Sequence, residues 1–207
     1  LKNKIPSKKE MKLIPIILII SILFITSCAI TDEAIAVDEC KSQEGLQVDN
    51  CYADKMACSK VSNEKVRDSC VAQLAEEKND VTVCNLVQGT TTKGFCQFQL
   101  AVKNNDNEIC KIIEDRYWVN NCYYNIAINN DQEVYCSVIT IAEQKGKCFE
   151  KIATSTNDVE LCKYLNEVDM NKCVYKIAQN LKDIKVCDNV NNVVGKDACR
   201  LKLAKIN

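Results

Sequence analysis

The sequence predicts an all-α fold, an α-solenoid of seven short helix-pair repeats with a period of about 26 residues and one disulfide in each repeat. Three observations support this prediction. Cysteines recur at nearly constant steps, the residue types around them recur with the same period, and no proline follows Cys28. The whole chain also has only five glycines and is rich in alanine, leucine, lysine and glutamate, a composition typical of helices.

Fourteen of the fifteen cysteines define the repeat. From Cys58 onward, each repeat has an A cysteine and then a B cysteine 12 residues later (once 11), and the next A cysteine follows after 14 residues. The first pair, Cys40 and Cys51, is followed by a shorter step of seven residues. The A cysteines are Cys40, Cys58, Cys84, Cys110, Cys136, Cys162 and Cys187, and the B cysteines are Cys51, Cys70, Cys96, Cys122, Cys148, Cys173 and Cys199.

A short helix is predicted around each A cysteine. An aspartate stands four residues before this cysteine in five repeats, at Asp54, Asp80, Asp106, Asp158 and Asp183, and Asp131 is displaced by one residue. Aspartate at such a position is a natural N-cap, because its carboxylate accepts the free N–H groups of the first helical turn. The spacing of Leu161 and Leu165 beside Cys162 then indicates a helix of about two turns.

A longer helix is predicted around each B cysteine. An aliphatic residue and an alanine follow this cysteine by four and five positions, as the pairs Leu74-Ala75, Leu100-Ala101, Ile126-Ala127, Ile152-Ala153, Ile177-Ala178 and Leu203-Ala204. A cysteine and an aliphatic residue four positions apart form one apolar stripe on a helix, and alanine allows close approach of a neighbour. The apolar positions follow periods of three and four, which argues against strands.

The first 27 residues are predicted to be a signal peptide. A lysine-rich start precedes an apolar run at 13–24, which is too short for a membrane span of roughly 20 residues. The run ends in Ile25-Thr26-Ser27-Cys28, which resembles the lipobox of prokaryotic lipoproteins. The resemblance implies that the Cys28 thiol carries a lipid and that cleavage leaves Cys28 as the first residue. The alternative is an ordinary signal peptide or anchor that contains a cysteine.

This interpretation divides the chain into a lipoprotein signal peptide (1–27), a lipidated tether (28–39) and a cysteine-rich α-helical repeat domain (40–207). A signal peptide places the repeat domain outside the reducing cytosol, where disulfides persist. Setting aside Cys28 leaves an even number of cysteines, which can all pair.

The spacing also favours one pattern of pairing. The A-to-B step stays at 11 or 12 residues, whereas the B-to-A step falls from 14 to seven at the first junction, and B-to-A pairing would leave Cys40 and Cys199 alone. We therefore predict Cys40–Cys51, Cys58–Cys70, Cys84–Cys96, Cys110–Cys122, Cys136–Cys148, Cys162–Cys173 and Cys187–Cys199. Closing a loop of about 12 residues stabilises a fold by about 3 kcal/mol in the chain-entropy model.

Charge and composition argue against several functions. From Cys28 onward there are 22 basic and 27 acidic residues, a net charge of −5 without a basic stripe, so we expect no nucleic-acid partner. Histidine is absent, and no phosphate-binding loop or catalytic motif occurs, so we expect neither an enzyme nor a cofactor. A cysteine-based copper or zinc binding or storage protein stays an alternative, although the chain has no CxxC motif.

One segment breaks the repeat with aromatic residues. Residues 115–124 contain four of the chain's aromatic side chains, and Trp118, the only tryptophan, stands four residues before its B cysteine. Other repeats have Val66, Thr92, Gln144, Asp169 and Gly195 at this position, so we expect it to lie near the surface. Arg116, Tyr117 and Trp118 are therefore candidate partner-binding residues, because arginine, tyrosine and tryptophan dominate interface hot spots. The alternative is that Trp118 fills a gap between the fourth and fifth repeats.

The predicted architecture resembles Sel1-like and tetratricopeptide solenoids in its plan alone, since this repeat is shorter and lacks their signature residues. The expected function is that of an extracytoplasmic lipoprotein, held at the cell membrane or cell surface by the lipid on Cys28. Its repeats would serve as a protein-interaction or structural scaffold for an unknown protein partner. A cell-envelope enzyme accessory is a second alternative.

Overall fold

The computed structural model describes residues 39–205, and every regular element in this range is helical. The predicted signal peptide, Cys28 and the tether up to residue 38 lie outside the described residues. The chain divides into two compact units, of which the first ends at Cys70 and the second begins at Val71, within one helix. No helix within 39–205 is both long and apolar enough to cross a membrane.

Long and short helices alternate along the chain, which confirms the predicted all-α repeat. The long helices are α3 (Leu46–Asp54), α4 (Glu64–Lys78), α5 (Thr90–Asn104), α7 (Arg116–Asn130), α9 (Ala142–Thr156), α10 (Glu167–Leu181) and α11 (Val193–Ala204). The short ones are η2 (Cys58–Lys60), η3 (Val81–Leu86), α6 (Asn107–Lys111), α8 (Glu133–Val138), η4 (Val159–Tyr164) and η5 (Ile184–Asn189). The η elements are 3₁₀ helices rather than the predicted two-turn α-helices, a geometry common in such short pieces.

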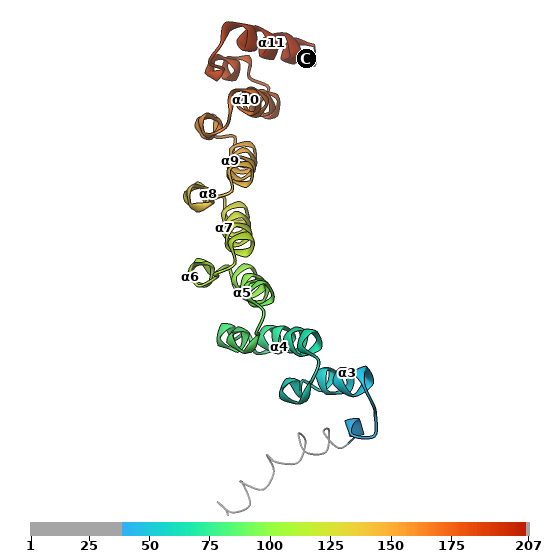
Figure 1. Ribbon diagram of the computed structural model, residues 1–207. Helices are drawn as coiled ribbons and strands as arrows, with labels where there is room; N and C mark the ends of the chain where they lie inside the picture. The colour runs from blue at the N-terminus through green and yellow to red at the C-terminus, as the bar shows by residue number, and fades with distance from the viewer. Residues whose placement is uncertain (1–38, 206–207) are drawn as a thin grey trace, which may run out of the picture. The chain divides into compact units, whose positions relative to one another are not determined.

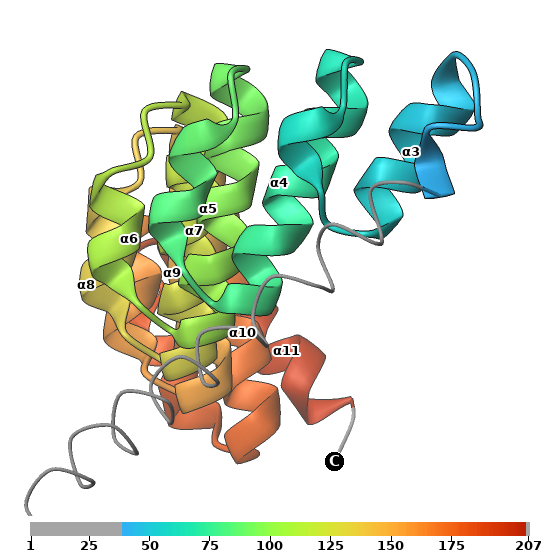
Figure 2. The ribbon, with the colours of Figure 1, turned by 90° about the horizontal axis from the view of Figure 1, so that it is seen from below.

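Within the second unit, the long helices α5, α7, α9 and α10 follow one another side by side (Figure 1). The short helices α6 and α8 lie together on one side of this layer, as a view from below also shows (Figure 2). The short helices α6, α8, η4 and η5 each pack against the long helix before them and the one after them, so α6 touches both α5 and α7. The second unit is therefore a stack of helix pairs, in which each pair contacts its sequence neighbours.

The predicted apolar stripe of the long helices forms the core of the second unit. Leu100, Ile126, Ile152 and Ile177 are all buried, and so are the alanines that follow them. Most A and B cysteines lie in the same core. The core therefore repeats with the sequence, because every long helix buries the same face.

A residue in the left-handed backbone conformation follows each of the long helices α4, α5, α7, α9 and α10. These residues are Asn79, Asn105, Asp131, Asn157 and Lys182, with φ between 50° and 57°. After α4, α5, α7 and α10, the residue that follows donates its N–H to the carbonyl of the core alanine five positions earlier, as Asp106 does to Ala101 at 2.9 Å. This is the helix-ending arrangement that asparagine and glycine favour.

The N-caps predicted for the short helices are found in four repeats. Asp80, Asp106, Asp158 and Asp183 each accept a hydrogen bond from the N–H two residues later, at 2.9 to 3.0 Å. The prediction is wrong for Asp54, which is the last residue of α3, because the first repeat is shorter than the others. Asp131 is not an N-cap either, since it takes the left-handed position that ends α7.

Candidate functional site

Seven disulfides join the A and B cysteines of each repeat. They are Cys40–Cys51, Cys58–Cys70, Cys84–Cys96, Cys110–Cys122, Cys136–Cys148, Cys162–Cys173 and Cys187–Cys199, the same pairs that the spacing predicts. Their Cα–Cα distances of 5.5 to 5.8 Å lie in the usual range for a disulfide. Each bridge thus ties a short helix to the long helix that follows it within one repeat.

The described residues offer little for metal or acid–base chemistry. Within 39–205, no group of three or more histidine, cysteine, aspartate or glutamate side chains is placed to hold a metal ion. The shifted carboxyl groups lie at the surface: a hydrogen bond from Lys147 lowers the pKa of Glu143, and Thr82 lowers the pKa of Asp80. Burial raises the pKa of the Tyr123 hydroxyl. These pKa shifts arise from an ion pair, a helix cap and side-chain packing within the repeats.

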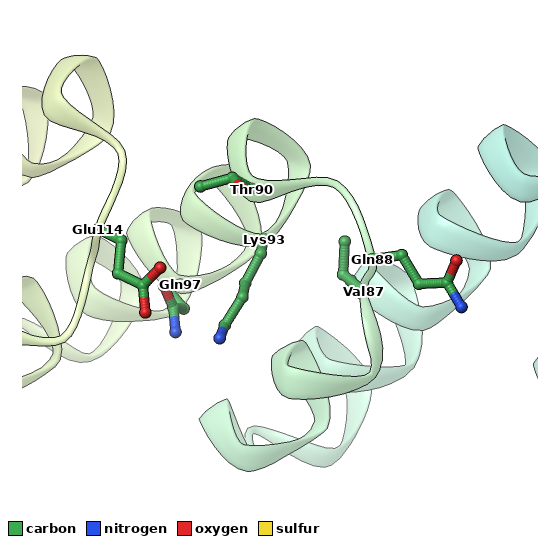
Figure 3. A pocket seen from close by; sticks show the side chains of 6 residues that line it. All are labelled: Val87, Gln88, Thr90, Lys93, Gln97 and Glu114. Atoms are coloured by element: carbon green, nitrogen blue, oxygen red, sulfur yellow. The ribbon is translucent and has the colours of Figure 1, made fainter.

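A polar hollow of about 220 Å³ lies beside the start of α5 (Figure 3). Lys93 and Gln97 from α5 point into it, and Glu114 approaches from the segment before α7. Lys93 and Glu114 are the charged residues of its lining, and the hollow holds no pair of carboxylates. It therefore does not resemble a catalytic site.

Trp118 is partly buried, so it lies near the surface without being fully exposed. Its ring packs 4.7 Å from Phe95 and 5.1 Å from Phe98, both on the preceding long helix α5. Gly94 makes room for this contact, since a Cβ there would lie 3.1 Å from Trp118 Cδ1. The Nε1–H of the indole is buried without a hydrogen-bond partner. Trp118 thus fills the space between two neighbouring repeats.

The two residues before Trp118 are more exposed than Trp118 itself. Arg116 is exposed, and Tyr117 is 59 % exposed while its ring meets the edge of Trp118 at 4.9 Å. Their assignment to partner binding stays a prediction. The sequence signal for the burial of Trp118 was present in Gly94 and Phe95, one repeat earlier.

A buried polar side chain two residues before the B cysteine connects some repeats with the next. Asn120 is only 2 % exposed, and its Oδ1 accepts the N–H groups of Thr140 at 2.6 Å and Ile141 at 3.3 Å. Ile141 is the N-cap of α9 and has no capping side chain of its own. In the first unit, buried Asp49 likewise accepts the N–H of Ser62 just before α4. Asn120 and Asp49 thus each hold the backbone that leads into the long helix of the next repeat.

Two other repeats have glycine at that position and cap the next long helix locally. After Gly94, Asp115 accepts the N–H groups of Tyr117 and Trp118, both at 3.0 Å. After Gly146, Asn166 accepts the N–H of Asp169 at 3.1 Å. Sequence reasoning missed this alternation, which is visible as Gly94, Asn120 and Gly146 against Asp115, Ile141 and Asn166.

The last pair of long helices has both an asparagine at this position and a local cap, and the first unit likewise has buried Asp49 and a local cap, because Asn63 accepts the N–H of Val66 at 3.2 Å. Asn192 caps α11 by accepting the N–H of Gly195 at 2.6 Å. Asn171 corresponds to Asn120, but its Oδ1 is buried without a hydrogen-bond partner. The amide oxygen that accepts N–H groups in the middle of the array is thus unsatisfied near the carboxyl end of the chain.

Polar side chains also link the carboxyl ends of the long helices. Asn104 donates to Asn79 Oδ1 at 2.8 Å, Asn130 and Asn105 bond each other, Ser155 donates to Asp131, and Asn180 donates to Asn157. In each link a residue near the end of one long helix reaches the left-handed residue of the repeat before it. This ladder holds neighbouring repeats in register.

Comparisons with protein-family models, with curated proteins and with solved structures find no match for this chain.

Proposed function

We propose that this protein is an extracytoplasmic lipoprotein whose helical repeats form a protein-interaction or structural scaffold at the cell membrane or cell surface. The observation that carries the proposal is one disulfide in each of the seven repeats. Disulfides persist in oxidising compartments, so they indicate an extracytoplasmic environment. Stacked repeats expose an extended surface, which suits a binding or structural role better than small-molecule chemistry.

The anchoring part of the proposal rests on the lipobox-like sequence that ends in Cys28. Mass spectrometry of the protein extracted from membranes tests it together with the disulfide map. The expected result is Cys28 as the first residue, a lipid adduct on its sulfur, and no free thiol among the other fourteen cysteines. A mature chain without lipid would overturn the anchor, and a C28S variant that still fractionates with membranes would do the same.

The scaffold part is tested by cross-linking on intact cells that make the protein. A scaffold is expected to yield a reproducible cross-link between a defined surface of 39–205 and one partner, and competition by the unlabelled repeat protein should reduce it. Absence of any competable partner would count against the scaffold. Metal storage requires free cysteines instead of disulfides, because only free thiolates bind Cu(I) or zinc. Fourteen reactive thiols in the exported protein would favour metal storage instead.

A further inference from the structure

A row of lysines marks the long helices of the last three repeats. Lys151, Lys176 and Lys202 each stand three residues after a B cysteine, on α9, α10 and α11. Lys147 and Lys172 lie one helical turn earlier on the same faces of α9 and α10. The second, third and fourth repeats have neutral residues three positions after the B cysteine, namely Gln73, Gln99 and Asn125, and the first repeat has Asp54. The row is therefore a property of the last repeats and not of the repeat itself.

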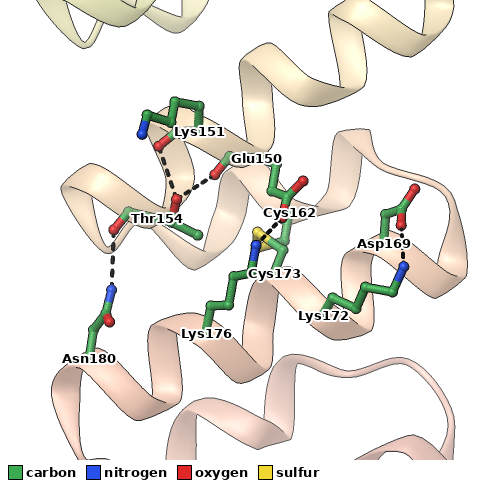
Figure 4. Close-up of polar contacts among 9 residues, drawn as sticks. All are labelled: Glu150, Lys151, Thr154, Cys162, Asp169, Lys172, Cys173, Lys176 and Asn180. Carbon is green, nitrogen blue, oxygen red and sulfur yellow. Dashed lines mark hydrogen bonds and ion pairs between the residues drawn. A yellow bond between two sulfur atoms is a disulfide. The ribbon is translucent and has the colours of Figure 1, made fainter.

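Local ion pairs neutralise this row only in part. Lys176 bonds Glu150 of the neighbouring helix at 2.6 Å, and Lys172 bonds Asp169 on its own helix at 3.0 Å (Figure 4). Lys147 bonds Glu143 on its own helix at 2.6 Å. Among residues 39–205, no carboxylate lies within ion-pair distance of Lys151 or Lys202.

The excess of positive charge extends to the whole of this end of the array. Residues 142–205 contain twelve basic and nine acidic side chains, a net charge of +3. Residues 39–141 contain ten basic and fifteen acidic side chains, a net charge of −5. The lysine row thus lies in the basic part of a chain that is otherwise acidic.

A shallow groove runs along the lysine row. Hollows of about 300, 310 and 340 Å³ follow one another over α9, α10 and α11, and Lys176 lines all three. Tyr175 lies in the last hollow, with the Nζ of Lys202 5.4 Å from its ring centre. Gln179 and Asn180 add amide groups to the floor, and Asn180 also reaches the carbonyl of Thr154 (Figure 4). The groove thus combines charge, amide donors and acceptors, and an aromatic surface.

We propose that this groove binds an extended acidic segment of a partner protein. Adjacent packed helices lie about 8–10 Å apart, so three lysines on three successive helices match carboxylates spaced about every third residue of an extended chain at roughly 3.3 Å per residue. The amides can bond the peptide backbone, which has both donors and acceptors. The proposed partner segment therefore has an acidic residue at about every third position, and this spacing is repeated two to three times.

A densely charged polyanion fits the groove less well than a peptide. Glu150 lines the groove and would repel closely spaced phosphates. Arginine, whose fork binds phosphate in two places, does not line these hollows, and Arg200 of α11 is paired with Asp188. The proposal gives a chemistry to the partner of the proposed scaffold and rests on that interaction role, but it does not depend on the lipid.

Fluorescence anisotropy with the disulfide-bonded full chain tests the groove. The probe is a labelled peptide of about nine residues with glutamate at every third position among glycine and serine, and the reference peptide has glutamine instead of glutamate. The triple variant K151Q/K176Q/K202Q is compared with K60Q/K65Q/K78Q, which removes the same charge elsewhere. Circular dichroism and thermal unfolding check that both variants fold.

The glutamate peptide is expected to bind more tightly than the glutamine peptide. The groove variant should lose about tenfold in affinity, since each exposed ion pair contributes about 0.2–1 kcal/mol, and the control variant should lose little. Equal losses in both variants, or equal binding of both peptides, would overturn the proposal. Tighter binding to polyphosphate or to phosphatidylglycerol vesicles would overturn it too. A cross-linked partner that contacts another surface would leave the scaffold standing and reject the groove alone.

Discussion

The side-chain oxygen Oδ1 of Asn120 accepts a hydrogen bond from the backbone N–H of Thr140 at 2.6 Å, across the junction between two consecutive repeats. The same side chain donates to the carbonyl of Arg116 at 2.6 Å and to Thr140 Oγ1 at 3.2 Å. Because Ile141 cannot cap α9, the start of this helix depends on a residue of the repeat before it. Adjacent repeats are therefore coupled by polar contacts as well as by the apolar core.

Replacement of Asn120 by alanine should destabilise the protein by about 2–3 kcal/mol, because it removes a buried side chain that bonds Thr140 and Ile141 of the next repeat. The matched variant N171A should instead be neutral or stabilising by up to about 1 kcal/mol, since it removes an unsatisfied oxygen from a helix. Denaturant unfolding of both variants measures the difference. Equal destabilisation of the two would contradict the assignment of Asn120 as the residue that joins these two repeats.

The local helix cap that Asp115 provides opposite Gly94 can be introduced one repeat later by mutation. The double variant N120G/I141D places the same residue types at the corresponding positions. It should be more stable than N120G alone by about 1 kcal/mol, the usual contribution of an N-cap. The single variant I141D is the control, and a gain of the same size there would show that the two caps act independently.

Gly94 and Gly146 occupy the same position of the repeat, but their replacement by alanine should change the stability of the protein in opposite directions. A Cβ at Gly94 would lie 2.9 Å from the Cβ of Asp115, so G94A has to push α7 away and should cost about 1–3 kcal/mol. A Cβ at Gly146 meets only Leu165 Cδ2 at 3.7 Å, so G146A should stabilise by about 0.5–1 kcal/mol. Thermal unfolding in the oxidised state measures both, and a stable G94A would refute the close packing of α5 and α7.

Lys182 holds a backbone conformation that lysine disfavours, with φ at 53°. The variant K182G should therefore stabilise the protein by about 1 kcal/mol, and K182N should give a smaller gain. K182A removes the same charge but keeps the unfavourable conformation, so it should give no gain. If K182A stabilised as much as K182G, charge rather than backbone conformation would be the cause.

Removal of one disulfide from the middle of the array should cost about 3 kcal/mol, the chain-entropy value for a loop of about 12 residues. The variant C110A/C122A leaves six bridges and adds no free thiol. Its stability is compared with that of the parent by denaturant unfolding without reductant. The single variant C110A, which leaves Cys122 unpaired, should be at least as unstable, and a thiol assay should find one reactive group after unfolding.

The cap of η3 should depend on pH. A hydrogen bond from the Thr82 hydroxyl lowers the pKa of Asp80 below its usual value of 3.8, and the Thr82 N–H acts in the same direction. A carboxyl group with a lowered pKa stabilises the fold above its unfolded pKa, and this contribution is lost as the pH falls through the folded value. NMR titration of Asp80 should therefore show a higher pKa in T82V than in the parent, and an unchanged pKa would contradict the hydroxyl contact.

The features that recur in every repeat could be predicted from the sequence. The pairing of Cys110 with Cys122, or the burial of Ile126, follows from a spacing that each repeat satisfies with the same helices. The N-cap at Asp106 is predictable for the same reason, because its carboxylate acts on the next turn of its own helix.

The features that depend on two adjacent repeats are harder to predict from the sequence. The position of Trp118 within its repeat left surface exposure and gap filling both open, because the environment of Trp118 is set by Gly94 and Phe95 of the repeat before. The role of Asn120 likewise appears only when it is paired with Ile141, about 20 residues later. Alignment of corresponding positions in different repeats does not reveal such contacts, because each contact joins different positions of two adjacent repeats.

The position of the disulfides also determines how the chain would respond to force. Every bridge closes within one repeat, so tension applied at the two ends can separate neighbouring repeats without breaking a covalent bond. In each stretched repeat the bridged Cα atoms stay 5.5 to 5.8 Å apart, while the remaining 14 or so residues can extend to roughly 50 Å. Disulfide-bonded chain can thus reach only about three-fifths of its full contour length. The oxidised repeat array thus has a fixed limit of extension.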